Sequence, residues 1–424
     1  MPSPPRFSRC FLLALIAWPA SAHASVQRIF LTSASGNGDL ASWAATDLDG
    51  VAGANEVCQT LAENAGLSPG SETFRAWLSD LGTDAYCNVQ GLTGKRSDIP
   101  ACAGGAEIGG GPWVRTDGKL FAASLAQISS GSATPYVPAS ILETGAEVAS
   151  VLTRIWTGSS SSGALTASSC TGFQVATGAG AAGRVETLAF GTGPTTACGG
   201  SQKLLCFETG VGDPVPLPSD PGYLAFVSAS VGSGELGSWA LANGETGIAA
   251  GDEVCRKEAE NGRLPAPESF RAWLSTSTTD AFCRIQGLTG TRADGCGGAT
   301  LPPPAPYRRP DGIEIAADLD DLSDGRLATP ILRLSGSVSF GGTWTGSGTD
   351  GTLDGQSCGD WLDPTTGVSA QTGAAQFLSP SWSVNGQNSC DLNFLGLYCF
   401  STVVTLFWDD FEGQSLTRWS DLQP

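Results

Sequence analysis

Cysteine is the residue type whose number and spacing carry the clearest chemistry in this chain. The 424 residues include 13 cysteines, and leaving out Cys10 gives 13 − 1 = 12. An even number of cysteines with matched spacing, in a chain that carries an export signal, predicts structural disulfides, although spacing alone leaves the pairing open. No Cys-x-x-Cys motif occurs, which argues against zinc ribbons and thioredoxin-like redox sites. The twelve cysteines form two sets of six: Cys58, Cys87, Cys102, Cys170, Cys198 and Cys206, then Cys255, Cys283, Cys296, Cys358, Cys390 and Cys399.

Histidine is almost absent, and this excludes several kinds of catalytic site. The single histidine is His23, beside a predicted cleavage site. Ser-His-Asp and Cys-His nucleophile systems and His-ligated zinc or iron are therefore excluded. Carboxylate pairs and oxygen-ligated calcium remain as chemistry that this chain could carry out.

The carboxylates that recur at matched positions all have structural explanations. Asp117 and Asp311 precede glycine, as turn residues do, and Glu56 and Glu253 fall in the first turn of a predicted helix. We therefore expect no enzyme, and a carboxylate-based polysaccharide hydrolase is the less favoured alternative. The third matched pair of acids is Asp84 and Asp280.

One acidic run is a weak candidate for calcium. Its carboxylates could supply oxygen ligands, but the corresponding segment 124–131 has none. Acidic turns are usually solvated loops, so we expect neither a metal nor a cofactor. The candidates are Asp318, Asp320, Asp321 and Asp324.

An internal duplication organises the elements that must position these residues. Residues 72–96 and 268–292 match at 17 of 25 positions without gaps, and shorter matches continue in the same order. We call residues 25–209 the first repeat and 222–402 the second repeat. Between them, the proline-rich linker 210–221 favours a semi-stiff spacer.

Hydrophobic periodicity predicts an α+β fold in each repeat. Apolar residues recur with a helical period around Cys58, and residues 74–79 alternate as in a strand. Short strands, one or two helices and long stapled loops are typical of α+β domains. Tryptophans present in both repeats are expected in the core. Those without a matching tryptophan are candidates for an exposed ligand platform, with packing under loops as the alternative: Trp113, Trp361 and Trp382.

The termini and the charge indicate an exported protein. Residues 1–24 combine a basic start, a short apolar run and a small-x-small cleavage site, as signal peptides do. Because Cys10 precedes the apolar run, a lipoprotein is not expected, and no other segment is long enough to cross a membrane. The net charge of −19 argues against nucleic-acid partners. Residues 403–424 resemble a short C-terminal sorting signature of exported bacterial proteins.

Both repeats resemble the endostatin domain of collagens and the bacterial endostatin-like family of leptospiral surface proteins, within the C-type-lectin-like fold. The similar segments are 53–67, 73–79, 115–118, 154–170 and 197–208, with counterparts throughout the second repeat. The resemblance implies a nested disulfide pairing: Cys58–Cys206, Cys170–Cys198 and Cys87–Cys102, then Cys255–Cys399, Cys358–Cys390 and Cys283–Cys296.

The same resemblance implies recognition as the function. The calcium-dependent sugar-binding motifs of the fold, such as Glu-Pro-Asn, are missing here. We therefore expect a secreted or cell-surface protein with two tandem disulfide-stapled domains that binds an extracellular protein or glycan without calcium. The alternative is a structural component of an envelope or matrix with no dedicated ligand.

Overall fold

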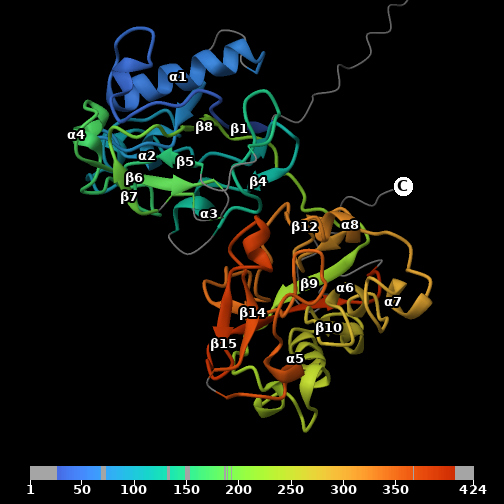
Figure 1. Cartoon of the computed structure of the whole chain (residues 1–424). Helices are drawn as coiled ribbons and strands as arrows, with labels where there is room; N and C mark the ends of the chain where they lie inside the picture. Colours follow the sequence, from blue (N-terminus) through green and yellow to red (C-terminus); the bar gives the residue numbers. More distant parts are fainter. Residues whose placement is uncertain are drawn as a thin grey trace, which may run out of the picture.

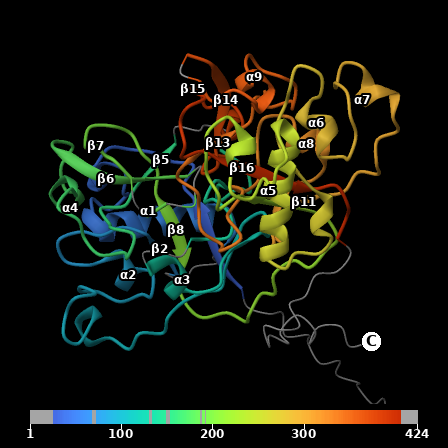
Figure 2. The same ribbon diagram turned by 90° about the horizontal axis from the view of Figure 1, so that it is seen from below.

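The computed structural model describes residues 26–67, 73–130, 134–148, 153–185, 188, 190–191, 193–365 and 367–405. The predicted signal peptide, and the predicted tail from residue 406 on, lie outside the described residues. The described chain is mixed α+β, as predicted. In Figure 1 the first repeat (blue to green) lies above the second (yellow-green to red), and Figure 2 shows the two bodies from below.

The first repeat is built on a five-stranded sheet in which the first and last strands are neighbours. The strand order is β2-β8-β1-β3-β4, with β1 antiparallel to β8 and parallel to β3. A second sheet, β5-β6-β7, meets the first through the isolated bridge between Ile155 and Lys203. The strands are β1 (Gln27–Leu31), β2 (Phe74–Ala76), β3 (Trp113–Arg115), β4 (Leu120–Ala122), β5 (Arg154–Trp156), β6 (Ala179–Arg184), β7 (Thr195–Ala197) and β8 (Leu205–Glu208).

The second repeat places corresponding strands in the same neighbourhoods. The order is β12-β11-β9-β16-β13-β14-β15, and β10 also pairs with β16. Here β13 pairs directly with β16, so the two sheets merge into one. The strands are β9 (Tyr223–Val227), β10 (Phe270–Ala272), β11 (Tyr307–Arg308), β12 (Glu314–Ala316), β13 (Gly342–Trp344), β14 (Ser369–Ala374), β15 (Gln387–Ser389) and β16 (Gly396–Ser401).

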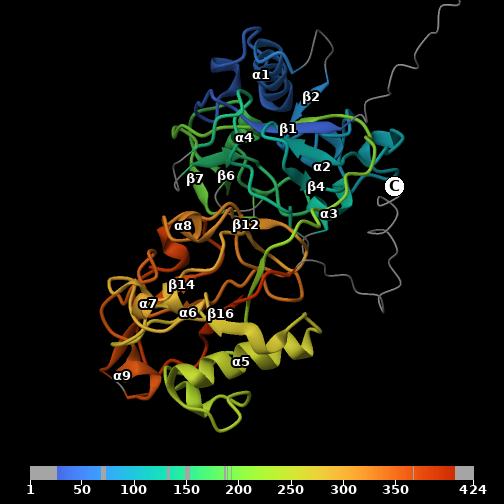
Figure 3. The same cartoon turned by 90° about the vertical axis from the view of Figure 1, so that its right-hand side faces the viewer.

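One long helix packs on each sheet, α1 (Gly50–Asn64) in the first repeat and α5 (Gly247–Asn261) in the second. Both lie at the outer ends of the molecule (Figures 1 and 3). The sequence predicts the first of these helices at 53–67. It begins earlier because Asp80 Oδ2 accepts the Val51 N–H at 2.8 Å, and it ends earlier because Gly66 takes a left-handed conformation (φ 71°). No helix in the described ranges is long and apolar enough to cross a membrane.

The remaining helices are single turns in the loops. The α-helical turns are α2 (Ala85–Asn88), α3 (Leu125–Ser129), α4 (Cys170–Phe173), α6 (Ala281–Arg284), α7 (Gly295–Gly298), α8 (Leu319–Leu322) and α9 (Cys358–Trp361). The 3₁₀ turns are η1 (Leu40–Ser42), η2 (Cys102–Gly104), η3 (Leu236–Ser238), η4 (Pro267–Ser269) and η5 (Pro380–Trp382).

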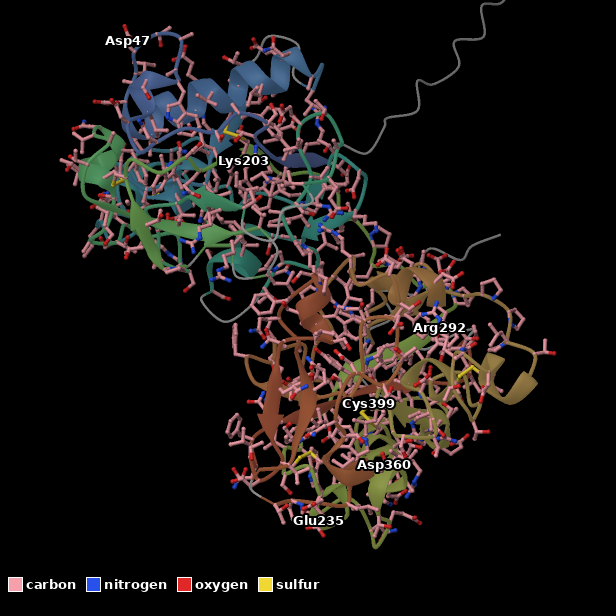
Figure 4. The ribbon with its side chains drawn as sticks, viewed as in Figure 1. Asp47, Lys203, Glu235, Arg292, Asp360 and Cys399 are labelled. Atoms are coloured by element: carbon pink, nitrogen blue, oxygen red, sulfur yellow. A yellow bond between two sulfur atoms is a disulfide. The ribbon has the colours of Figure 1, made fainter. Side chains whose placement is uncertain are left out.

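Six disulfides tie these elements together, and they are the pairs that the resemblance implies. Cys58 on α1 is bonded to Cys206 on β8, and Cys255 on α5 to Cys399 on β16, which Figure 4 labels. All twelve cysteines have less than 3% of their surface exposed, so the bonds belong to the cores. The other pairs are Cys87–Cys102, Cys170–Cys198, Cys283–Cys296 and Cys358–Cys390.

The two repeats contact each other through corresponding faces. Arg309 Nη1 and Thr329 Oγ1 both donate to the Tyr136 carbonyl at 3.0 Å, and Arg326 Nη2 donates to Glu147 Oε1 at 2.8 Å. Ile313 is buried within a hydrophobic cluster of the first repeat. The repeats are therefore packed against each other and not merely tethered.

The linker is held by both repeats and does not act as the predicted spacer. Gly212 N–H donates to the Gly111 carbonyl at 2.9 Å, and Leu217 packs against a core cluster of the first repeat. The Pro218 carbonyl lies so close to Gly312 that a Cβ there would be 2.0 Å away. These contacts fix the path of the chain between the repeats.

Candidate functional site

The predicted tryptophan platform is wrong. Trp113, Trp361 and Trp382 each have 0% of their surface exposed. Trp382 packs on Trp273 with ring centroids 5.2 Å apart, as Phe190 packs on Trp77 in the first repeat at 5.4 Å. Tryptophans without a matching tryptophan thus fill the same core positions that another aromatic residue fills in the other repeat.

Carboxylates of the acidic run around α8 accept backbone N–H groups at and beside this helix, and they do not form a cation site. Asp318 accepts the N–H of Asp321 at 2.9 Å, and Asp321 in turn accepts the N–H of Ala317 at 2.6 Å. Asp324 accepts the Arg326 N–H at 2.8 Å, while Asp320 lies in the first turn of α8. No group of three or more potential metal-ligating side chains occurs among the residues that the structure describes.

In two of the three matched pairs of acids, the carboxylates stabilise loops through hydrogen bonds and ion pairs. Asp84 accepts the N–H groups of Arg96 and Leu165, both at 2.9 Å, and Asp280 accepts the equivalent pair in the second repeat. Asp117 and Asp311 each hold an arginine within the same turn. Burial alone would raise the pKa of Asp117, but the hydrogen bond and charge of Arg115 outweigh it and lower that pKa.

A cleft of about 680 Å³ lies in the first repeat, between helix α1, strand β2 and the loops that follow them. Its lining combines amide and hydroxyl side chains with apolar ones, and it also includes the charged residues Glu56, Arg75 and Asp80. Leu48 and Leu81 have 45% and 62% of their surfaces exposed. A concave site of this size, with a few fixed polar groups, is typical of ligand-binding pockets.

The cleft has a pair of buried amides among its lining residues. Asn55 on α1 and Asn88 on α2 have 8% and 3% of their surfaces exposed. Each carboxamide nitrogen donates to the oxygen of the other residue at 2.9 Å. The same pair binds strand β2, because the Ala76 N–H donates to Asn55 Oδ1 at 2.9 Å and Asn88 Nδ2 donates to the Ala76 carbonyl at 2.7 Å.

Two carboxylates also line the cleft, Asp80 and Glu56, and both are engaged. Asp80 accepts N–H groups from Val51, Gly82 and Thr83 at 2.7–2.8 Å, so it fastens the loop to the start of α1. Glu56 Oε2 accepts the Thr46 hydroxyl at 2.5 Å. Its counterpart Glu253 lies on α5, where the hydrogen bond from Arg256 lowers its pKa. These contacts give the two acids of the cleft structural partners.

The second repeat has an ion pair where the first has the amides. Asp252 corresponds to Asn55 and Arg284 to Asn88, and Arg284 Nη2 lies 2.5 Å from Asp252 Oδ1. Arg271 approaches Asp252 to 3.6 Å, and the Ala272 N–H donates to it at 2.9 Å. Burial raises the pKa of Asp252, while the charge of Arg284 acts in the opposite direction. Long charged side chains thus stand where the first repeat has short neutral ones.

Asn55 and Asn88 belong to no motif, so a search for motifs passes over them. The available signal was a paired difference: both positions change between the repeats, from two neutral amides to opposite charges, inside otherwise similar segments. No protein-family model matches this chain, and a search of curated proteins finds no match.

Proposed function

We propose that this chain is an exported recognition protein with two tandem endostatin-like, C-type-lectin-like domains, and that it binds an extracellular ligand without calcium and without catalysis. The fold assignment is supported by the nested disulfides and by the pairing of the first and last strands in each repeat. An extracellular setting is consistent with the six disulfides.

The single observation that carries this proposal is the cleft beside α1. It is hollow, its lining includes neutral hydrogen-bonding groups, and Leu48 and Leu81 add exposed apolar surface at the rim. Neutral donors and acceptors recognise a ligand by the positions of its polar groups, and they need no cation to do so. The acids in the cleft fasten loops, which supports binding over hydrolysis.

The test is an array of matrix proteins and glycans probed with the purified chain, once with calcium and once with a chelator. We expect at least one ligand whose binding survives the chelator. Binding that disappears with the chelator would overturn the calcium-independent mode and direct attention to Asp318 and its neighbours. No binding at all would favour the structural role in an envelope or matrix.

The same array can locate the binding site. The double variant Asn55→Asp/Asn88→Arg gives the first repeat the ion pair that the second repeat already accommodates. We expect it to lose the ligand while it keeps its fold. The matched control is Asp252→Asn/Arg284→Asn, which leaves the first repeat unaltered and should bind at least as well as the unaltered chain.

A further inference from the structure

The amide pair in the cleft has one edge in use. Along that edge a single residue of strand β2, Ala76, offers its N–H to Asn55 Oδ1 and its carbonyl to Asn88 Nδ2, at 2.9 and 2.7 Å. The pair therefore exchanges two hydrogen bonds with one backbone residue, as a neighbouring strand does in an antiparallel sheet.

On its opposite edge, the pair has hydrogen-bonding groups that no described residue uses. A carboxamide has two N–H donors and two acceptor lone pairs. Within the described part of the chain, the bonds of the pair leave one N–H on Asn55 Nδ2 and one lone pair on Asn88 Oδ1 unassigned. Because the two carboxamides bond reciprocally, this donor and this acceptor lie together on the edge away from Ala76. Both side chains are more than nine-tenths buried and both line the cleft.

We infer that the cleft binds an extended peptide segment, one residue of which donates its N–H to Asn88 Oδ1 and accepts from Asn55 Nδ2. The inference rests on the proposed recognition function and names the partner for it. The amide pair then stands between β2 and the ligand and bonds to a backbone residue on each side. Backbone contacts of this kind supply affinity in strand-like recognition, and side-chain contacts supply specificity.

The rest of the cleft favours a peptide over a glycan. The aromatic ring in its lining, that of Phe74, has 1% of its surface exposed and presents no face for a sugar to stack on. Leu48 and Leu81 instead offer exposed apolar surface at the rim, which suits the side chains of an extended peptide. The buried amide pair is neutral, so we expect the residue paired with it to be uncharged.

The second repeat does not present this arrangement of donor and acceptor, although Arg284 Nε is buried there without a partner among the described residues. Asp252 is an acceptor and Arg284 a donor, and the two are bound to each other. The chain is therefore expected to bind one peptide, through the first repeat alone.

The experiment selects ligands from a displayed library of short random peptides, with the full mature chain as bait. The recovered peptides are then synthesised and their affinities measured against the unaltered chain, Asn55→Asp/Asn88→Arg and Asp252→Asn/Arg284→Asn. We expect the first variant to bind at least about tenfold more weakly and the second, whose first repeat is unaltered, to bind at least as tightly as the unaltered chain. In a series of peptides methylated at one backbone nitrogen each, a single position should lower the affinity about tenfold. That series needs no altered protein, so it holds even if a variant folds poorly.

Several results would overturn the inference. These are an absence of recovered peptides, peptides that bind Asn55→Asp/Asn88→Arg normally, or a methylation series without a sensitive position. If a matrix protein or glycan still binds the chain in those cases, recognition stands and only the peptide assignment falls. If nothing binds, both proposals fall.

Discussion

The two repeats share the arrangement of the long helix and the strands, and they differ at the cleft of the first repeat. In both, a polar side chain on the long helix accepts the N–H of the second strand, Asn55 from Ala76 and Asp252 from Ala272, each at 2.9 Å. The partner across the gap changes with it, from an amide to a guanidinium. The hydrogen bond that supports the fold is thus kept in both repeats, while the pair of side chains changes from two neutral amides to an ion pair.

A second difference shows how the loops stay together with a different residue in each copy. In the first repeat Asp80 fastens its loop to helix α1. In the second repeat the carboxylate comes from Asp360 on α9, labelled in Figure 4, which accepts from the Ser277 N–H at 2.8 Å and the Ser277 hydroxyl at 2.6 Å. A carboxylate thus holds this loop in both repeats, to helix α1 in the first and to α9 in the second.

The largest expected effect tests whether the repeats are equally dependent on their disulfides. Cys58–Cys206 and Cys255–Cys399 span 148 and 144 positions, and in the chain-entropy model each contributes about 5 kcal/mol to the free energy of unfolding. Cys58→Ala/Cys206→Ala should unfold the first repeat and spare the second, as seen by hydrogen exchange in β8 and β16. Equal loss of protection in both repeats would show instead that they unfold as one unit.

The next test separates the ion pair from the amide pair. Arg284→Ala leaves Asp252 with a less complete set of partners and should lower the free energy of unfolding by about 3 kcal/mol. Asn88→Ala leaves neutral groups unpaired and should cost about 1–2 kcal/mol. Urea unfolding of both variants measures the difference. A larger loss for Asn88→Ala would contradict the comparison, and Asp252→Asn/Arg284→Asn should recover part of the loss caused by Arg284→Ala.

A smaller effect is expected at Trp77 and Trp273, the matched tryptophans that directly follow strands β2 and β10. Trp273 Nε1 donates to Ser383 Oγ at 3.0 Å, whereas the buried Trp77 Nε1 has no partner among the described residues. Gly191 stands in the place of Ser383, and a Cβ there would lie 3.7 Å from Trp77 Nε1 without any closer contact. Gly191→Ser should raise the melting temperature, with a gain of about 1 kcal/mol from the new hydrogen bond. Gly191→Ala is the control, and an equal gain from it would refute the hydrogen bond.

The smallest expected effect is a difference between the two repeats in how their stability depends on pH at the acid end. Burial alone would raise the pKa of Asp360, but hydrogen bonds from Ser277 and Ser357 outweigh it and hold this pKa below the ordinary value of 3.8. Its charged form therefore stabilises the second repeat above pH 3.8, and this contribution is lost as the pH falls through the lowered pKa. We expect less than about 1 kcal/mol, because solvent screens a partly exposed carboxylate.

Urea unfolding at a series of pH values, read from hydrogen exchange in β16, checks this pH dependence. Asp360→Asn should flatten the dependence below about pH 4. The first repeat carries Gly172 at the matching position and should not respond to that substitution. A variant with the same acid sensitivity as the unaltered chain would refute the role of Asp360.

The α+β class, the position of the long helices and the role of the cysteines could be predicted, because each depends on local periodicity or on matched spacing. The tryptophans could not. Trp382 has no matching tryptophan along the chain, but in space it corresponds to Phe190, and sequence alone does not place residues from such dissimilar loops. The cleft was missed for a different reason: Asn55 and Asn88 lie 33 positions apart and meet only after helix and strand have packed.

The bond between the long helix and the last strand also has a mechanical consequence. If the chain is pulled at its two ends, tension enters each repeat through its adjacent first and last strands. It then passes across Cys58–Cys206, which takes the 148-position segment between these cysteines out of the path of the force. Fully extended, that segment would lengthen the chain by about 500 Å. While the disulfides stay intact, the segments that they enclose cannot add to the length of the chain under load.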